Sequence, residues 1–327
     1  MKAIVIGQYG DPDVLVLRDI PDPAIGPEDV LVAVRATALN RADILQRRGF
    51  YPQPGPKPQF EVPGLEFAGE VLAAGERVLG IAVGDRVMGL LAGGGYAEKV
   101  ATHFRLVSVI PDCLSYEEAA ALPEALITAH DALSQCGLVC GESVLVHAAG
   151  SGVGTSVVQV AKAMGATPVI GTAGSAEKLA QAAALGLDAG INYKEEQFAE
   201  RARELTGGRG VDVVVDFVGA SYLAANVQAM AEKGRMVVVG LMGGFSGELP
   251  LGPLLNKRLQ IRGTLLRSRP LEEKALATRA FEKSVLPHVA AGAIVPVIDS
   301  VMPLAEAPAA HRRMESNANF GKIVLRV

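Results

Sequence analysis

The sequence predicts an α/β protein in which a β-rich region precedes a doubly wound parallel sheet. Two observations predict this class. The first 120 residues consist largely of short apolar or alternating runs divided by Gly, Pro and Asp, which is typical of short strands joined by turns. From Ser143 onward, strand-like and helix-like segments alternate, and several of the strand-like segments are almost wholly apolar, as strands covered on both faces must be.

The β-rich region is expected to hold six strands, a proline-rich loop and a helical stretch. The strands are predicted at Lys2–Ile6, Val14–Arg18, Val30–Ala36, Glu66–Ala74, Asp85–Leu90 and Tyr96–Ala101. The proline-rich run Tyr51–Pro58 is compatible with an SH3-type ligand, but a stiff surface loop is the favoured interpretation. The alanine-rich segment Tyr116–Leu133 has a helical pattern, and Pro123 should start a new helix there or kink this one.

The alternating region supplies the strands and helices of the parallel sheet. Its strands are predicted at Val144–His147, Pro168–Thr172, Gly190–Tyr193, Val211–Val218 and Met236–Gly240. Its helices are predicted at Val153–Met164, Ala176–Leu185 and Gln197–Leu205. After Gly263 the alternation stops, and a closing strand at Ile323–Val327 is expected to return to the first domain. We therefore expect a first domain over 1–121, a nucleotide-binding domain over 122–264, and a return to the first domain over 265–327.

Composition narrows the classes of function. Of 327 residues, half are hydrophobic and 20% are charged, which excludes a disordered or fibrous chain. A formal net charge of −4 argues against a nucleic-acid or anionic-membrane binder. Three cysteines cannot fill a four-cysteine zinc lobe and make a poor disulfide framework. With no secretory signal at the start of the sequence, and with three glycines breaking the uncharged stretch Ser143–Ala161, the expected location is the cytoplasm.

A glycine-rich run joins the first strand of the alternating region to its first helix. The sequence His147-Ala-Ala-Gly-Ser-Gly-Val-Gly154 lies where a dinucleotide fingerprint requires small residues and a helix N-terminus beside the pyrophosphate. The strict GxGxxG pattern is not met, because Ala149 and Ser151 occupy its first two glycine positions, whereas Gly152 and Gly154 remain. The context of strand, turn and amphipathic helix favours a dinucleotide site over a glycine turn without a ligand.

The end of the second strand favours NADPH over NADH. NAD sites usually place Asp or Glu there to hold the ribose 2′-hydroxyl, but this sequence has no acid at the strand end. Ser175 is a natural N-cap, and Lys178 stands where a capping box would have Glu or Gln. A 2′-phosphate would accept hydrogen bonds from the serine hydroxyl, the helix N–H groups and the lysine. The plainer interpretation is that Lys178 is an exposed lysine in a tolerated position. Glu177 would argue against a 2′-phosphate only if its side chain faced the ribose.

The residues resemble the zinc-free quinone oxidoreductases of the medium-chain dehydrogenase/reductase superfamily, and among them the tumour-suppressor-inducible branch related to zeta-crystallin. The motifs that carry this resemblance span the chain: Ala38–Asp43, Gly64–Glu66, Leu91–Gly95, Pro123–Ala125, His147–Gly154, Asn192–Lys194, Gly240–Gly244, Leu265–Arg269 and Gly321–Leu325. The resemblance implies a GroES-like catalytic domain formed by both chain ends around a Rossmann domain.

The resemblance also implies site residues. The pyrophosphate turn would hold Gly152, Val153 and Gly154, and the 2′-phosphate would contact Ser175, Lys178 and Tyr193. Asn40 and Tyr51 would stand near the substrate as catalytic groups. Further cofactor contacts are implied for Thr128, Gly240, Leu241, Met242, Leu265, Leu266, Arg267 and Asn319. Plainer roles are open for Tyr51 (covering apolar surface), Tyr193 (a core-edge aromatic) and Asn40 (a helix cap with Asp43), whereas structural roles are favoured for His130 and His147.

Within this resemblance, the sequence lacks the residues that bind zinc in the zinc-dependent relatives. Zinc-dependent relatives carry Cys at the first ligand position and His in a Gly-His-Glu motif, but here the first position falls within Asn40–Asp43 and Leu65 replaces the histidine. The three cysteines, Cys113, Cys136 and Cys140, lack the spacing of a structural zinc lobe, although Cys136 and Cys140 would share a face if both lay on one helix. The expected enzyme therefore has no metal ligands.

The expected activity is the NADPH-dependent reduction of quinones by hydride transfer. An enone or alkenal reductase is the alternative that uses the same groups, and a crystallin-like or RNA-binding non-enzymatic protein is the alternative of another class. We expect a small-molecule quinone or enone substrate, no nucleic-acid or membrane partner, and a homodimer. A strand at Leu259–Leu266 would form the edge through which a second copy extends the sheet.

Overall fold

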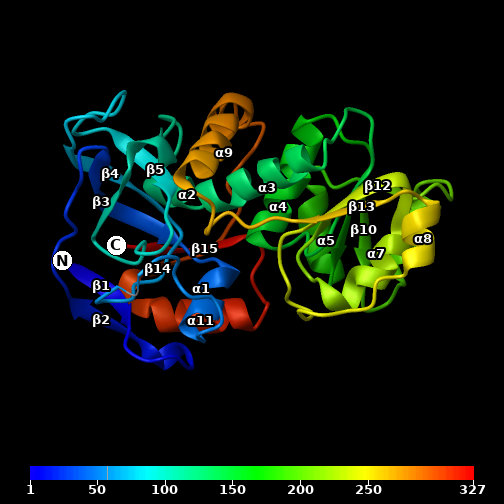
Figure 1. Ribbon diagram of the computed structural model, residues 1–327, viewed down its shortest axis with the longest axis horizontal. Coiled ribbons are helices and arrows are strands. Elements are labelled where there is room, and N and C mark those ends of the chain that lie inside the picture. The colour runs from blue at the N-terminus through cyan, green and yellow to red at the C-terminus, as the bar shows by residue number, and fades with distance from the viewer. Residues whose placement is uncertain (57) are drawn as a thin grey trace. The chain divides into compact units, whose positions relative to one another are not determined.

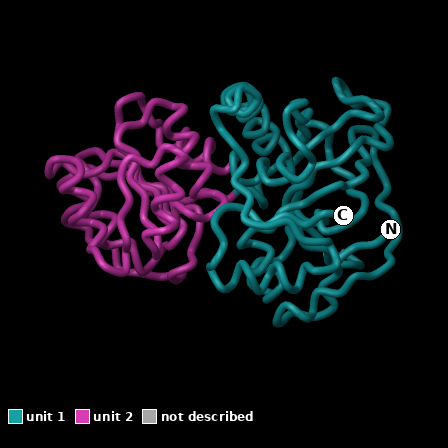
Figure 2. The backbone as a smooth tube through the Cα atoms, turned by 180° about the vertical axis from the view of Figure 1, so that it is seen from behind, with its two compact units in different colours: residues 1–127, 266–327 teal, residues 128–265 magenta. Residues whose placement is uncertain are grey.

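The computed structural model describes residues 1–56 and 58–327. These residues form two compact units, coloured separately in Figure 2: unit 1 comprises Met1–Ile127 and Leu266–Val327, and unit 2 comprises Thr128–Leu265. The boundaries expected from the sequence, after residues 121 and 264, lie slightly N-terminal to these. Among the described residues, no helix is both long and apolar enough to cross a bilayer.

Unit 1 is built on a seven-stranded sheet in the order β14-β15-β3-β4-β5-β7, with β6 paired to β3 (Figure 1). Its strands are β3 (Asp29–Ala38), β4 (Glu66–Ala74), β5 (Arg86–Leu90), β6 (Lys99–His103), β7 (Val107–Val109), β14 (Ile298–Pro303) and β15 (Lys322–Arg326). A separate antiparallel pair is formed by β1 (Lys2–Ile6) and β2 (Leu15–Asp19). β15 runs antiparallel to β3 with Val324 opposite Ala38, which confirms the predicted return of the C-terminal strand to the first domain.

Helices and apolar side chains complete unit 1. The helices are α1 (Arg41–Arg47), α2 (Tyr116–Ala120), α9 (Leu271–Ser284), α10 (Leu286–Ala290) and α11 (Ala307–Glu315), together with the first turns of α3 (Pro123–Gln135). Alternate residues of β3, including Val30 and Val32, pack with Val71 and Val87 in one fully buried cluster. The predicted break at Pro123 is confirmed, because α2 ends at Ala120 and Pro123 opens α3, where its missing N–H costs nothing.

Unit 2 is a six-stranded parallel sheet in the order β10-β9-β8-β11-β12-β13. Its strands are β8 (Val144–Val146), β9 (Val169–Ala173), β10 (Ala189–Asn192), β11 (Val211–Asp216), β12 (Met230–Val238) and β13 (Gln260–Gly263). The helices that follow these strands are α4 (Gly152–Ala163), α5 (Ala176–Ala183), α6 (Phe198–Leu205), α7 (Leu223–Ala229) and α8 (Leu251–Asn256). The strand order reverses between β8 and β11, so the doubly wound sheet is confirmed and its ligand crevice is expected at the carboxyl ends of these strands.

Three local predictions were inaccurate for identifiable reasons. β12 begins at Met230 instead of Met236, because the turn signal at Lys233 and Gly234 is an irregularity within the strand: Lys233 has φ 58°, and the pairing with β11 shifts register nearby. β13 is shorter than Leu259–Leu266, ending at Gly263. Cys136 and Cys140 do not share a helix face, because α3 ends at Gln135; Cys136 is buried and Cys140 is exposed.

Candidate functional site

The turn after β8 leads directly into the start of α4. Ser151 caps this helix by accepting a hydrogen bond from the Gly154 N–H at 3.0 Å. A Cβ at position 154 would lie 2.1 Å from the carbonyl oxygen of Ala148, so only glycine allows the turn to pack this closely on the helix. The first helical N–H groups, at Gly152 and Val153, have no carbonyl partner within a helix. This turn has the backbone donors and the space that a pyrophosphate needs.

The end of β9 gathers the residues predicted for the 2′-phosphate. Ser175 is the N-cap of α5, and its Oγ accepts a hydrogen bond from the Lys178 N–H at 3.4 Å. An ideal Cβ on Gly174 would lie 2.7 Å from the Tyr193 hydroxyl and 3.2 Å from Cε of Lys194, so both side chains lie against the residue that precedes Ser175. The fold therefore brings Ser175, Lys178 and Tyr193 together.

Lys194 is a member of this group that the sequence analysis did not select. It directly follows Tyr193, and its N–H donates to the Asn192 side chain at 3.2 Å. The sequence did hold a signal for Lys194, because it is a basic residue directly after Tyr193 at the end of the third strand of the parallel sheet. Two lysines therefore flank the end of β9.

The loop after β12 packs on the loop after β11. The Met242 N–H donates to the Phe217 carbonyl at 3.3 Å, and the Gly243 N–H donates to the Val218 carbonyl at 2.7 Å. A Cβ on Gly240 would meet the Phe217 carbonyl oxygen at 2.9 Å. Leu241 and Met242 are left 42% and 52% exposed, which places apolar side chains at the carboxyl end of the sheet; their contact with a cofactor stays a prediction.

His147 has a structural role inside unit 2, as predicted. It is fully buried; its Nε2 donates to Asn226 Oδ1 at 2.6 Å, and its Nδ1 accepts from the Thr172 hydroxyl at 2.9 Å. Burial lowers the pKa of His147 to about 4, so the ring is neutral and joins β8 to β9 and α7. His130 lies partly buried on α3, and burial also lowers its pKa.

In unit 1, Asn40 belongs to a buried group formed with Glu66 and Lys322. Its Nδ2 donates to Glu66 Oε1 at 2.8 Å, and its Oδ1 accepts from Lys322 Nζ at 2.7 Å. Lys322 Nζ also donates to Glu66 Oε1 at 2.6 Å and to the Leu39 carbonyl at 2.9 Å. The helix-cap interpretation of Asn40 has support, because its backbone N–H donates to Asp43 at the start of α1. Its amide is engaged with Glu66 and Lys322, and its catalytic role stays a prediction.

Asp43, in the first turn of α1, supports this arrangement. Its carboxylate accepts hydrogen bonds from the backbone N–H groups of Asn40 and Gly64 and from the Tyr96 hydroxyl. Burial raises the pKa of Asp43 to about 6, against the lowering effect of these backbone donors. His311 contacts the same Tyr96 hydroxyl at 3.3 Å, and burial followed by the charge of Arg47 lowers its pKa to about 3.

Tyr51 is held by Arg267. The guanidinium of Arg267 lies over the Tyr51 ring, 4.9 Å from its centroid, and donates to the Tyr51 carbonyl at 3.0 Å. Its other nitrogens donate to the Ala92 carbonyl and to Gln46 Oε1, both at 2.7 Å. The Arg267 side chain, 4% exposed, thus fixes the start of the proline-rich loop, a contact that its predicted cofactor role did not anticipate.

The Tyr51 hydroxyl has no hydrogen-bond partner among the described residues, so it is available as a donor. Burial first, and then the charge of Glu124, raise the pKa of Tyr51 to about 12, which keeps the phenol protonated at neutral pH. Glu124 is a functional candidate that the sequence analysis quoted only within the Pro123–Ala125 motif.

The remaining predicted residues are distributed over both units. Thr128 and Leu265 lie at the ends of unit 2, and Leu266 and Asn319 belong to unit 1. Leu265 is 46% exposed, whereas Thr128, Leu266 and Asn319 are buried, with the Asn319 Nδ2 donating to the Gly321 carbonyl at 2.9 Å. Their contacts with a cofactor stay predictions.

Two protein families match separate parts of the chain. Residues 26–112 match the "Alcohol dehydrogenase GroES-like domain" family and residues 152–282 match the "Zinc-binding dehydrogenase" family. A quinone oxidoreductase of Pseudomonas aeruginosa is 35% identical over 331 residues, covering 99% of both chains. The chain belongs to the quinone oxidoreductase-like members of the medium-chain dehydrogenase/reductase superfamily. The resemblance seen in the sequence is confirmed, and this quinone oxidoreductase-like protein is an oxidoreductase.

Solved structures agree with the fold of this quinone oxidoreductase-like protein. The Escherichia coli quinone oxidoreductase, solved in complex with NADPH, superposes with a TM-score of 0.89 at 30% identity and covers 100% of both chains. A protein described as an NAD-dependent alcohol dehydrogenase superposes equally well, with a TM-score of 0.89 at 36% identity and complete coverage of both chains. The GroES-like and Rossmann domains are therefore confirmed, while the acceptor and the preferred nucleotide have to be argued from the site.

Proposed function

We propose that this protein reduces quinones with NADPH by hydride transfer and without a metal ion. The observation that carries the proposal is the end of β9, where Ser175, Lys178 and Tyr193 lie near one another and no carboxylate stands at the strand end itself. A 2′-phosphate suits a hydroxyl, a helix N-terminus and an ammonium group together. The NADPH complex of the Escherichia coli relative supports this choice.

The residues present fit such a cofactor. Gly152 and Val153 would hold the pyrophosphate at the start of α4, and Gly240, Leu241 and Met242 would line the other half of the cofactor. When bound, NADPH supplies the hydride, and the chain's own residues hold and orient the reactants. On the substrate side, the Tyr51 hydroxyl is proposed to donate a hydrogen bond to the acceptor oxygen, whose negative charge grows during reduction.

The polar group around Asn40 does not suit zinc. The Lys322 ammonium already binds Asn40 Oδ1 and Glu66 Oε1, and the buried side chain of Leu65 offers no donor atom. A divalent cation would stand against the ammonium charge and would have too few ligands. We infer that Lys322 supplies the positive charge of this group and that the reaction proceeds without a metal.

Steady-state NADPH oxidation, measured with chelator-treated protein and a panel of quinones and enones, tests the proposal. We expect turnover with quinones that chelation does not reduce. Preference for enones or alkenals would contradict quinone reduction as the main activity and support the alternative of a double-bond reductase. Tight NADPH binding without turnover of any acceptor would contradict both and favour a non-enzymatic role.

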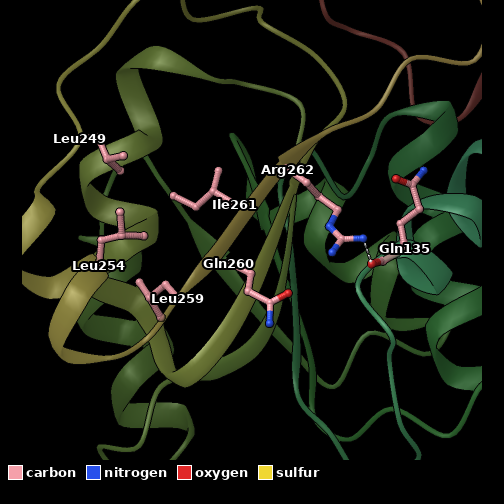
Figure 3. Close-up of a pocket in the computed structure, with 7 residues that line it drawn as sticks. All are labelled: Gln135, Leu249, Leu254, Leu259, Gln260, Ile261 and Arg262. Atoms are coloured by element: carbon pink, nitrogen blue, oxygen red, sulfur yellow. Dashed lines mark hydrogen bonds between the residues drawn. The ribbon is translucent and has the colours of Figure 1, made fainter.

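We further propose that the protein acts in the cytoplasm as a homodimer and binds no nucleic acid. The edge strand β13 and α8 border a groove of unit 2 lined by Gln135, Leu249, Leu254, Leu259, Gln260, Ile261 and Arg262 (Figure 3). On α8, Leu251 is 67% exposed and Leu255 is 77% exposed. An edge strand beside exposed leucines suits a second copy, which would extend the sheet and cover the apolar side chains.

A further inference from the structure

Glu124 is a carboxylic acid held firmly by its backbone but not by its side chain. It is the second residue of α3, and its N–H donates to Glu66 Oε2 at 2.8 Å. Its own carboxyl group makes no hydrogen bond with any other described residue. Because the bond to Glu66 fixes the first turn of α3, the position of Glu124 is set by the same buried group that holds Asn40 and Lys322.

The hydrogen bonds decide which of the two neighbouring carboxyl groups holds a proton. Glu66 accepts from Lys322 Nζ and Asn40 Nδ2 on one oxygen and from the Glu124 N–H on the other, so three donors stabilise its negative charge. Glu124 has no such donor, and the charge of Glu66 opposes a second negative charge nearby. Glu124 therefore holds its proton more tightly than an ordinary glutamic acid.

We propose that Glu124 is the proton donor of the reduction, giving its carboxyl proton to the acceptor oxygen when the hydride is transferred. The inference rests on the proposed function and names a catalytic residue for it. The Glu124 O–H bond breaks and an O–H bond forms on the reduced acceptor, while the electron pair comes with the hydride from NADPH. Glu124 is left as a carboxylate, unchanged in oxidation state, and recovers its proton from water.

The electrostatic surroundings suit this role. Burial first, and then the charge of Glu66, raise the pKa of Glu124 to about 8, which lies close to neutral pH as general acid catalysis requires. The titratable and charged groups around Glu124 come from several elements of unit 1. They are Glu66 on β4, Asp43 on α1, Tyr51 in the loop after α1, Arg267, Lys274 on α9 and Lys322 on β15. Lys322, Arg267 and Lys274 are cations. The charges of Lys322 and Arg267 lower the pKa of Glu124, whereas those of Glu66 and Asp43 raise it.

The variant Glu124→Gln tests the proposal, because glutamine keeps the size and polarity of the side chain but carries no acidic proton. In the wild-type protein, kcat/KM should hold below pH 8 and fall as the pH rises through about 8, where Glu124 loses its proton. Glu124→Gln should lower kcat/KM by roughly 10²- to 10⁴-fold and abolish this fall and the solvent deuterium isotope effect. The matched control is Glu118→Gln, a partly buried capping partner of Ser115 on α2 at which glutamine keeps the capping box.

Two further measurements separate the possible outcomes. In Glu124→Gln, NADPH affinity and thermal stability should match those of the wild type. Infrared titration of the wild-type protein without NADPH should show a protonated carboxyl band that disappears near pH 8, and Glu124→Gln should lack this band. Wild-type rate, pH profile and isotope effect in Glu124→Gln would overturn the proton-donor role alone. A wild-type protein that turns over no quinone or enone would instead overturn the proposed function, and the donor role with it.

Discussion

At the scale of the residue, nucleotide choice depends on a few side chains around Gly174. Ser175 caps α5, the Tyr193 hydroxyl and the Lys194 side chain lie against Gly174, and Lys178 stands in the first turn of α5. Lys178 was predictable, because a lysine in the first turn of a helix opposes the helix dipole unless an anion binds there. Lys194 was not selected, because its approach to Gly174 depends on the pairing of β10 with β9.

Removing the Lys178 ammonium should weaken NADPH selectively. A charge-assisted hydrogen bond contributes about 1.5–3 kcal/mol, so Lys178→Ala should raise the KM for NADPH roughly 10- to 100-fold and leave that for NADH nearly unchanged. Steady-state kinetics with both nucleotides measures this, and Lys162→Ala, which removes a surface lysine paired with Asp188, is the control. Equal effects on the two nucleotides would refute the phosphate assignment.

The Tyr51 hydroxyl should matter to the acceptor and not to the nucleotide. Tyr51→Phe should lower kcat by up to about 10²-fold, because one donor to a developing oxyanion is lost, while the KM for NADPH stays constant. Tyr116→Phe is a matched control, since Arg86 lies 4.8 Å from the Tyr116 ring centroid in the same kind of cation–π contact. Unchanged turnover in Tyr51→Phe would remove this residue from the mechanism.

At the scale of the element, local patterns predicted the strands of unit 2 and its helices α4, α5 and α6, because these segments carry an apolar period and several of them are followed by glycine. The Asn40–Glu66–Lys322 group was not predictable in this way. Lys322 and Glu66 are 256 positions apart and meet only because β15 returns beside β3. The same is true of Arg267 and Gln46, which are 221 positions apart, so sequence motifs located the candidate site but not its internal hydrogen bonds.

The loop that follows α1 should depend on Arg267. Arg267→Lys keeps the charge but loses the planar guanidinium that reaches Ala92, Tyr51 and Gln46 at once. We expect faster proteolysis within residues 50–56 and a higher KM for the quinone, with little change for NADPH. Arg105→Lys, at an exposed pair with Glu272, provides the comparison. Wild-type proteolysis and KM in Arg267→Lys would contradict this role.

The buried His147 should make unit 2 sensitive to acid. Its pKa is about 4 in the folded protein and near 6.5 when unfolded, so the unfolded chain binds the proton first as the pH falls. Stability from this group is complete above pH 6.5 and decreases toward pH 4 by at most about 3 kcal/mol. His147→Gln should be less stable at pH 7 and should lose less stability between pH 7 and 5 than the wild type in denaturant titrations. An equal loss in both proteins would argue against a neutral buried His147.

At the scale of the whole molecule, the proposed function assigns separate chemical tasks to the two units. Unit 2 presents backbone N–H groups and lysines that suit phosphates, and unit 1 presents Tyr51, Glu124 and the buried lysine group that suit an acceptor gaining charge. The chain folds back into unit 1 after Leu265, which places Arg267 and Lys322 in the same unit as Tyr51 and Asn40. Because the chain returns to unit 1, residues from both ends of the sequence contribute to the group of side chains around Asn40 and Tyr51.

The proposed dimer makes a prediction at this scale. The double variant Leu251→Glu/Leu255→Glu places charges on the exposed face of α8 and should convert the homodimer to a monomer in sedimentation equilibrium, because both leucines would be buried by the second copy. Leu276→Glu, which is 68% exposed on α9 of unit 1, should leave the mass unchanged. A wild-type monomer, or a dimer in the double variant, would contradict the proposed interface.

The most direct test of the central claim is a single-turnover measurement. Chelator-treated protein loaded with NADPH is mixed rapidly with a quinone, and the loss of NADPH absorbance is followed with NADPH carrying hydrogen or deuterium at the transferred position. We predict rapid oxidation that is slower with deuterium and unaffected by chelation. NADPH that stays reduced in the presence of every quinone, or oxidation that requires added zinc, would contradict the account.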